Sequence, residues 1–97
     1  VFLLLTVILI ILFNRHITMF YTYVLKSVKS GKFYIGSTAD LVDRLIRHNS
    51  GRSKYTKSER PWELYYKEEF TTRSEAMSRE RELKSWKSHV RIEKLPG

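Results

Sequence analysis

The chain has 97 residues, which is enough for one domain with a modest hydrophobic core. It carries 18 lysines and arginines against 10 acidic residues, and a net charge of +8 favours a polyanionic partner such as nucleic acid or an anionic membrane surface. The lack of cysteine excludes disulfides, thiolate catalysis and cysteine-ligated metal sites, and it fits a reducing compartment such as the cytoplasm.

The N-terminal segment differs in character from the rest. Residues 1–13 (VFLLLTVILIILF) are apolar except for Thr6, but a membrane-spanning helix needs about 20 such residues, and the segment lacks the basic start and cleavage site of a signal peptide. Because Met19 stands directly before a strand-like run, we interpret residues 1–18 as sequence upstream of the true start and residues 19–97 as the folded domain. A short membrane anchor is the alternative, and only that interpretation gives the protein a membrane partner.

The residues after Met19 predict a β-hairpin. The run FYTYVLKS (20–27) is rich in aromatic and β-branched residues, as strands are. Gly31 can take the positive φ of a turn, and KFYIGS (32–37) then forms the returning strand.

A first helix follows the hairpin. Thr38 or Asp40 can cap it, it covers about residues 39–49, and Gly51 is well placed to end it. Residues 50–61 (SGRSKYTKSERP) then predict a polar loop with four basic residues and one acid.

The segment WELYYKEEF (62–70) predicts a third strand. Apolar and polar side chains alternate in it, which places on one face Trp62, Leu64, Tyr66 and Phe70. A second helix opens with a capping box of Thr72 and Glu75, runs to about residue 88, and precedes a short helical or frayed tail. The predicted order is β-β-α-β-α, which is an α+β domain.

Glu80 interrupts the apolar stripe of the second helix. Helical spacing aligns it with Ala76, Leu83 and Trp86, where a carboxylate is costly unless it pairs with a cation or a metal. An ion pair with a neighbouring arginine at the edge of the core would explain Glu80 without any function.

Arg44 and His48 show a similar pattern on the first helix. His48 shares a stripe with Leu41 and Leu45, and Arg44 lies beside that stripe, four residues earlier. A core histidine with satisfied hydrogen bonds and an arginine paired with Asp40 would each be sufficient structural explanations.

Tyr23 and Tyr34 fall on the two hairpin strands, where tyrosine is common. Together with Arg44, His48 and Glu80 they can form one concave patch where the hairpin meets both helices. Such a patch offers a base for water, a cation for the charge on a phosphate and a carboxylate for a divalent metal. This combination suits phosphodiester cleavage.

The order and spacing of these residues resemble the GIY-YIG endonuclease superfamily. The matching segments are YTY (21–23), YIG (34–36), RLIRHNSG with Arg44 and His48, and EAMSRE ending in Glu80. More specifically, the chain resembles the small single-domain branch that is similar to the N-terminal nuclease domain of the excinuclease C subunit. The resemblance covers residues 19 to about 95.

The resemblance implies a three-stranded antiparallel sheet flanked by helices, and metal-dependent cleavage of DNA in repair or processing. It implies catalytic roles for Tyr23, Tyr34, Arg44 and His48, a backbone turn at Gly36 and metal binding by Glu80. The implied cation is Mg²⁺, with Mn²⁺ as the alternative, and one carboxylate suffices because Mg²⁺ keeps several waters. The proton of the attacking water would go to Tyr23, either directly or with help from His48.

One position departs from the family pattern in a way that affects charge. Ser37 stands where some relatives have a lysine, so we expect that charge to come from elsewhere, with Lys32 as the candidate. The first motif also reads Tyr-Thr-Tyr and lacks the initial glycine, which leaves the matching tyrosine in place.

The polar loop is a candidate path for the DNA backbone, unless it is simply a solvated charged loop. Its candidate contacts are Arg52, Lys54, Tyr55, Lys57 and Arg60. From residue 19 onward the charge is +7, so a nucleic-acid-binding module without catalysis is the alternative to a nuclease. We expect no small-molecule cofactor, and the sequence leaves single-stranded, duplex and branched DNA open as substrates.

Overall fold

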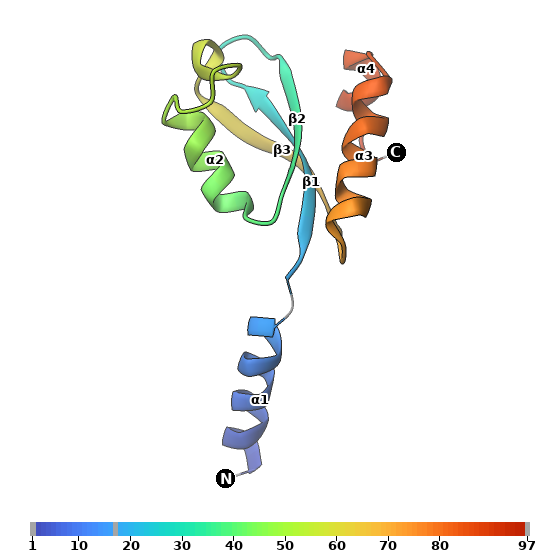
Figure 1. The fold of residues 1–97 in the computed structure, drawn as a ribbon. Helices are drawn as coiled ribbons and strands as arrows, with labels where there is room; N and C mark the ends of the chain where they lie inside the picture. Colours follow the sequence, from blue (N-terminus) through green and yellow to red (C-terminus); the bar gives the residue numbers. More distant parts are fainter. Residues whose placement is uncertain (1, 17, 97) are drawn as a thin grey trace.

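The computed structural model describes residues 2–16 and 18–96, and for residues 11–16 it describes the backbone alone (Figure 1). The elements in chain order are α1 (Phe2–His16), β1 (Phe20–Ser27), β2 (Phe33–Thr38), α2 (Leu41–Asn49), the 3₁₀ turn η1 (Lys57–Glu59), β3 (Trp62–Phe70), α3 (Arg73–Ser85) and α4 (His89–Glu93). Helix α1 stands apart from the sheet in Figure 1, and its first apolar side chains are exposed. Over the described ranges, none of the helices has both the length and the apolar character needed to cross a membrane.

The three strands form one antiparallel sheet in the order β2-β1-β3. This confirms the predicted α+β fold class and its three-stranded sheet. The predicted bounds of β1 and β3 match the structure, whereas β2 begins and ends one residue later than predicted. Gly31, in the hairpin turn, has φ 78°, the left-handed conformation that the turn requires.

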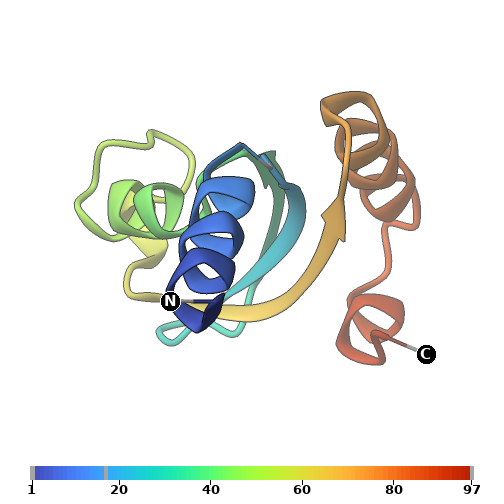
Figure 2. The same ribbon diagram turned by 90° about the horizontal axis from the view of Figure 1, so that it is seen from below.

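Helices cover both faces of the sheet, because successive side chains of a strand point to opposite sides (Figure 2). On one face, α2 packs over a cluster built around Tyr23, Leu25 and Trp62. On the other face, α3 and α4 pack over a cluster built around Val24, Leu83 and Ile92. The two helices that carry the candidate site residues therefore lie in different layers.

The helix caps follow the predicted chemistry, with one exception. Asp40 caps α2 by accepting a hydrogen bond from the backbone N–H of Asp43 at 3.0 Å. Thr72 caps α3 in the same way, accepting from Glu75 N–H at 3.2 Å. The predicted end of the second helix at residue 88 is wrong: α3 ends at Ser85, because Ser88 caps a separate helix, α4, by accepting from the N–H of Arg91.

The predicted single apolar face of β3 is also wrong. The pairing with β1 shifts register, so that Leu25 faces Leu64 whereas Val24 faces Tyr66, and Tyr65 forms a bulge between them. The extra residue inverts the alternation. Trp62 therefore packs in the α2 layer, whereas Tyr66 packs in the layer of α3 and α4.

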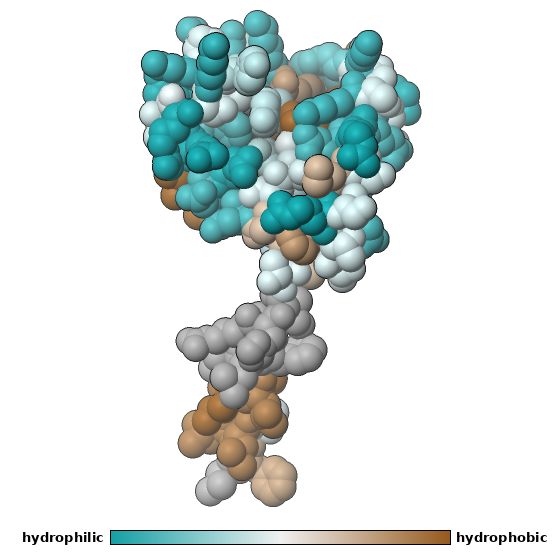
Figure 3. Space-filling model, viewed as in Figure 1, coloured by the Kyte–Doolittle hydropathy of each residue, from teal (hydrophilic) through white to brown (hydrophobic). Residues whose placement is uncertain are grey.

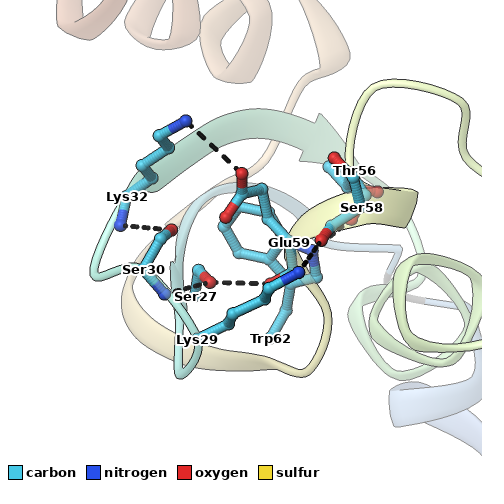
Figure 4. Close-up of polar contacts among 8 residues, drawn as sticks. All are labelled: Ser27, Lys29, Ser30, Lys32, Thr56, Ser58, Glu59 and Trp62. Carbon is cyan, nitrogen blue, oxygen red and sulfur yellow. Dashed lines mark hydrogen bonds and ion pairs between the residues drawn. The ribbon is translucent and has the colours of Figure 1, made fainter.

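The polar loop is tied to the hairpin turn, as Figure 4 shows. The hydroxyl of Ser27 donates to the carbonyl of Glu59 at 2.7 Å, and the ammonium of Lys29 donates to the carbonyl of Ser58 at 3.1 Å. Lys32 pairs with the carboxylate of Glu59 at 3.4 Å. These contacts make the loop and the turn one structural unit.

Gly36 provides space for Tyr23, which lies opposite it across the β1–β2 ladder. A Cβ at residue 36 would lie 2.5 Å from the phenol oxygen of Tyr23 and 2.7 Å from its Cζ. Gly36 lies within β2, so the expected backbone turn at this residue is wrong. What the position requires is the absence of a side chain.

We predict that Gly36→Ala destabilises the protein by about 1–3 kcal/mol, because the added methyl group overpacks a buried contact. Urea unfolding of the variant and the wild type measures the change. Gly31→Asn is the control, since nothing lies within 4 Å of a Cβ at Gly31 and asparagine tolerates a positive φ. Equal unfolding midpoints for Gly36→Ala and the wild type would contradict the assigned role of Gly36.

Candidate active site

The candidate site lies at the β2 edge of the sheet, where groups from both helical layers meet. Tyr23 reaches this edge from β1 by extending its phenol across Gly36. Glu80 reaches it from α3 and accepts a hydrogen bond from the hydroxyl of Ser37, the next residue of β2, at 2.6 Å. The predicted meeting of the hairpin with both helices therefore lies at a strand edge between two layers.

A chain of hydrogen bonds runs behind Tyr23 through the α2 layer. The phenol oxygen of Tyr23 lies 3.1 Å from Nε2 of His48, and Nδ1 of His48 lies 2.8 Å from Oγ1 of Thr56. All three residues are 1% exposed. Thr56 donates its own proton to the carbonyl of Ser53 at 3.4 Å, so its oxygen accepts from Nδ1–H. Nε2 is then the unprotonated nitrogen, and it accepts a hydrogen bond from the hydroxyl of Tyr23.

The surroundings keep both titratable groups of this chain neutral. Burial raises the pKa of Tyr23, and the nearby Tyr34 and Glu80 add to that effect, whereas the positive charge of Arg44 opposes it. Burial lowers the pKa of His48, and the charges of Arg44 and Arg47 lower it further. At neutral pH the phenol keeps its proton and the imidazole is uncharged.

Tyr34 and Arg44 complete the α2 side of the site. The ring of Tyr34 lies 4.7 Å from that of His48 and 6.3 Å from that of Tyr23, measured between centroids. Arg44 is half-buried, and its positive charge acts on the phenol of Tyr23. The alternative in which Arg44 pairs with Asp40 is wrong, because no ion pair of the described residues joins them.

Glu80 is half-buried, with 20% of its side chain exposed, and it forms an ion pair with Lys84 one helical turn later. The expected arginine partner is therefore replaced by a lysine, and Arg79 pairs with Glu68 and Glu82 instead. In the described part of the chain, no three His, Asp or Glu residues are grouped as metal ligands. A single fixed carboxylate still fits Mg²⁺, which binds through one or two carboxylates and retains water.

Three of the predicted loop contacts gather in a basic hollow. Lys54, Lys57 and Arg60 line it together with Lys29 and Asn49. Two contacts hold Arg60 in place. Its Nε donates to the carbonyl of Lys57 at 2.8 Å, and its guanidinium packs against Gly51 so closely that a Cβ there would lie 2.7 Å from Nη1.

The other predicted DNA contacts lie outside the hollow. Tyr55 is 87% exposed, and Arg52 donates from Nε to the hydroxyl of Ser50 at 3.0 Å. Lys32 pairs with Glu59 and lies beside the second helical layer, so its expected role as a substitute for the family lysine gains no support.

Several residues of the site escape reasoning from the sequence. Thr56 has no local pattern, since the loop that carries it is placed by tertiary contacts. Asn49 fixes the end of α2 by exchanging two hydrogen bonds with the backbone of Trp62, at 3.0 and 2.7 Å. The ion pair of Lys84 with Glu80 could have been predicted, because the two residues are four apart on a helix.

Comparison with known proteins places the chain among relatives of the same size. Residues 19–93 match the family described as the GIY-YIG catalytic domain. A UPF0213 protein of Bacillus pumilus is 52% identical over 67 residues, which are 68% of this chain and 67% of the relative. A UPF0213 protein of Staphylococcus saprophyticus is 42% identical over 73 residues, which are 74% and 88% of the two chains.

A solved structure also resembles the chain. The solution NMR structure of a UPF0213 protein from Bacillus halodurans is 36% identical and covers 79% of this chain and 81% of that one, with a TM-score of 0.49. The family match spans the hairpin, α2, β3 and the helix with Glu80, and so contains every group at the β2 edge. The chain therefore belongs to the GIY-YIG family of nucleases.

Proposed function

We propose that the protein is a metal-dependent endonuclease that hydrolyses DNA phosphodiester bonds and acts in DNA repair or processing. The observation that carries this proposal is the buried hydrogen-bond chain from Tyr23 to a neutral His48, beside Arg44 and at the same strand edge as Glu80. A buried core tyrosine needs one hydrogen-bond partner for its hydroxyl, but it does not need a cation and a carboxylate nearby. The small domain offers little surface for reading bases, so DNA structure rather than sequence determines the choice of substrate.

Tyr23 and His48 act together as the general base. The phenol oxygen takes a proton from the attacking water while the phenol proton passes to Nε2 of His48, 3.1 Å away. Thr56 supports the transfer by holding the proton on Nδ1. Because burial raises the pKa of Tyr23, a free phenolate is costly, and a coupled transfer avoids it.

Arg44 controls access to this base. Tyr23 is 1% exposed, and the positive charge of Arg44 acts on its phenol. A phosphate that attracts Arg44 would expose the phenol oxygen to water and stabilise the charge that develops on the phosphate. Tyr34, beside His48, would orient the phosphate by a hydrogen bond.

Glu80 would hold the divalent cation, which supplies charge stabilisation at a phosphate oxygen when bound. Ser37 fixes one carboxylate oxygen, whereas the other is held by Lys84, whose side chain is 53% exposed and can move away. The basic hollow gives the DNA backbone a second contact, to which Lys29 contributes.

A cleavage panel tests the proposal. The purified chain is incubated with Mg²⁺ or Mn²⁺ and with single-stranded, duplex and branched DNA. We expect Glu80→Gln to lower cleavage by about 10²–10³-fold, because the group that binds the cation is lost. Glu82→Gln, a nearby exposed carboxylate on α3, should leave cleavage unchanged.

Two results of this panel count against a nuclease. Equal cutting by the wild type and Glu80→Gln would mean that the activity comes from a contaminant. Binding of DNA by the wild type without cleavage of any substrate would favour the non-catalytic binding module.

The pKa of His48 gives a test that does not require activity. Arg47 is one of the charges that lower it, so Arg47→Gln should raise the pKa of His48 toward its ordinary value of 6.5. A pH titration of the imidazole signals by NMR measures this, with Lys94→Gln as the control. A pKa above 6.5 in the wild type, or no change in Arg47→Gln, would contradict the neutral, buried His48.

The same shift sets the pH dependence of stability. The unfolded chain binds a proton at His48 at a higher pH than the folded chain does, so the free energy of unfolding falls as the pH drops below 6.5. This loss should be smaller in Arg47→Gln, because its shift is smaller.

Competition between Lys84 and the cation gives a further test. We expect Lys84→Met to tighten Mn²⁺ binding by about two- to fivefold, because no ion pair must be broken. Isothermal titration calorimetry measures this, with Lys94→Met as the control. Weaker binding by Lys84→Met would place Lys84 among the groups that support the cation.

A further inference from the structure

A groove separate from the basic hollow runs between β2 and the two C-terminal helices. Its floor is apolar and is formed by Phe33, Ile35, Leu83 and Ile92. In Figure 3, apolar surface lies between two hydrophilic surfaces at the place where Figure 1 draws β2 facing α3 and α4. The volume of about 310 Å³ is at the lower end of the range for small-ligand sites, so the groove has room for one nucleobase and is too small to enclose a duplex.

The rim of the groove is basic. It carries Lys32, Lys84 and Lys87, with His89 beside them. Carboxylates outside the lining pair with three of these side chains: Glu59 with Lys32, Glu80 with Lys84, and Glu93 with His89. Among the ion pairs of the described residues none involves Lys87, so Lys87 is the rim cation that is available to a phosphate. Lys87 is exposed and has φ 48°, a left-handed conformation that is uncommon for a residue other than glycine. This conformation, between the end of α3 and the cap of α4, places a cation at the junction of the two helices.

An aromatic pair lies at one end of the groove. The imidazole of His89 stacks on the ring of Phe33, with centroids 4.4 Å apart and planes inclined by 26°. The side chain of His89 is 53% exposed, so it keeps surface available for another ring. Aromatic surface beside cations is the chemistry that binds unpaired nucleotides, because bases stack while phosphates pair with lysine.

The groove lies next to the candidate active site at the β2 edge. Lys84 lines the groove and also pairs with Glu80, the proposed cation ligand. A DNA strand whose phosphate lies at Glu80 can therefore place a neighbouring nucleotide in the groove without crossing another element.

From this arrangement we infer that the groove binds an unpaired nucleotide of the DNA strand that is cut. The inference rests on the proposed nuclease function and narrows its substrate class to DNA with a single-stranded segment next to the scissile bond. A base occupies the apolar floor and stacks on His89, and its phosphate contacts Lys87.

Equilibrium binding in EDTA tests this without any cleavage. Fluorescence anisotropy compares a blunt duplex with duplexes of equal length that carry a three-nucleotide extension at the 5′ or the 3′ end. A 2-aminopurine in the extension reports stacking by a loss of fluorescence. The proteins are the wild type, Lys87→Gln, His89→Ala, and Lys94→Gln as a control for the loss of one positive charge.

We expect the wild type to bind at least one extended duplex about fivefold more tightly than the blunt duplex, with quenching of the 2-aminopurine. Lys87→Gln and His89→Ala should reduce this preference and the quenching, whereas Lys94→Gln should keep both. Thermal unfolding by circular dichroism establishes that the variants are folded.

Equal affinity of the wild type for blunt and extended duplexes overturns the inference, and so does a preference that both groove variants retain. Either result leaves the nuclease proposal intact if the cleavage panel depends on Glu80. Conversely, a preference for extended duplexes without cleavage of any substrate would support the groove as a site for an unpaired nucleotide and would contradict the proposed nuclease activity.

Discussion

The contact between the phenol of Tyr23 and the bare backbone of Gly36 determines how the site is built. Tyr23 belongs to the central strand, and a side chain there would ordinarily be enclosed by one helical layer. Because residue 36 has no Cβ, the phenol extends over β2, the edge strand of the sheet, and stays only 1% exposed. Glu80 reaches the same edge from the opposite layer, so one missing methyl group lets two layers share a site.

This arrangement uses part of a small core for polar groups. His48 and Thr56 are both buried, and every buried side-chain nitrogen or oxygen of the described residues has a hydrogen-bond partner. Satisfied polar groups hold their geometry, whereas unsatisfied ones would favour rearrangement or unfolding. The α2 layer therefore gains a fixed orientation for the imidazole and gives up apolar contact area that a domain of this size could use for stability.

Much of this fold could be predicted from the sequence, because strand alternation, helix spacing and capping residues all indicated the same elements. The bounds of β1 and β3, the caps at Asp40 and Thr72, and the misfit of Glu80 on its helix were all readable from spacing. The placement of helices on opposite faces was not readable, since the order of elements does not say which face each helix covers. Thr56 was missed because its loop is positioned by tertiary hydrogen bonds, including Trp62 Nε1 donating to the carbonyl of Thr56 at 2.8 Å.

The bulge at Tyr65 constrains the length of β3 in this chain. Trp62 and Tyr66 are four residues apart and would share a face of a regular strand, but they pack in different layers because one extra residue lies between them. Substitutions along β3 change single contacts, but the loss of one residue between these two positions would turn half of the strand inside out. The number of residues between Trp62 and Tyr66 is therefore fixed by the two clusters that these side chains join.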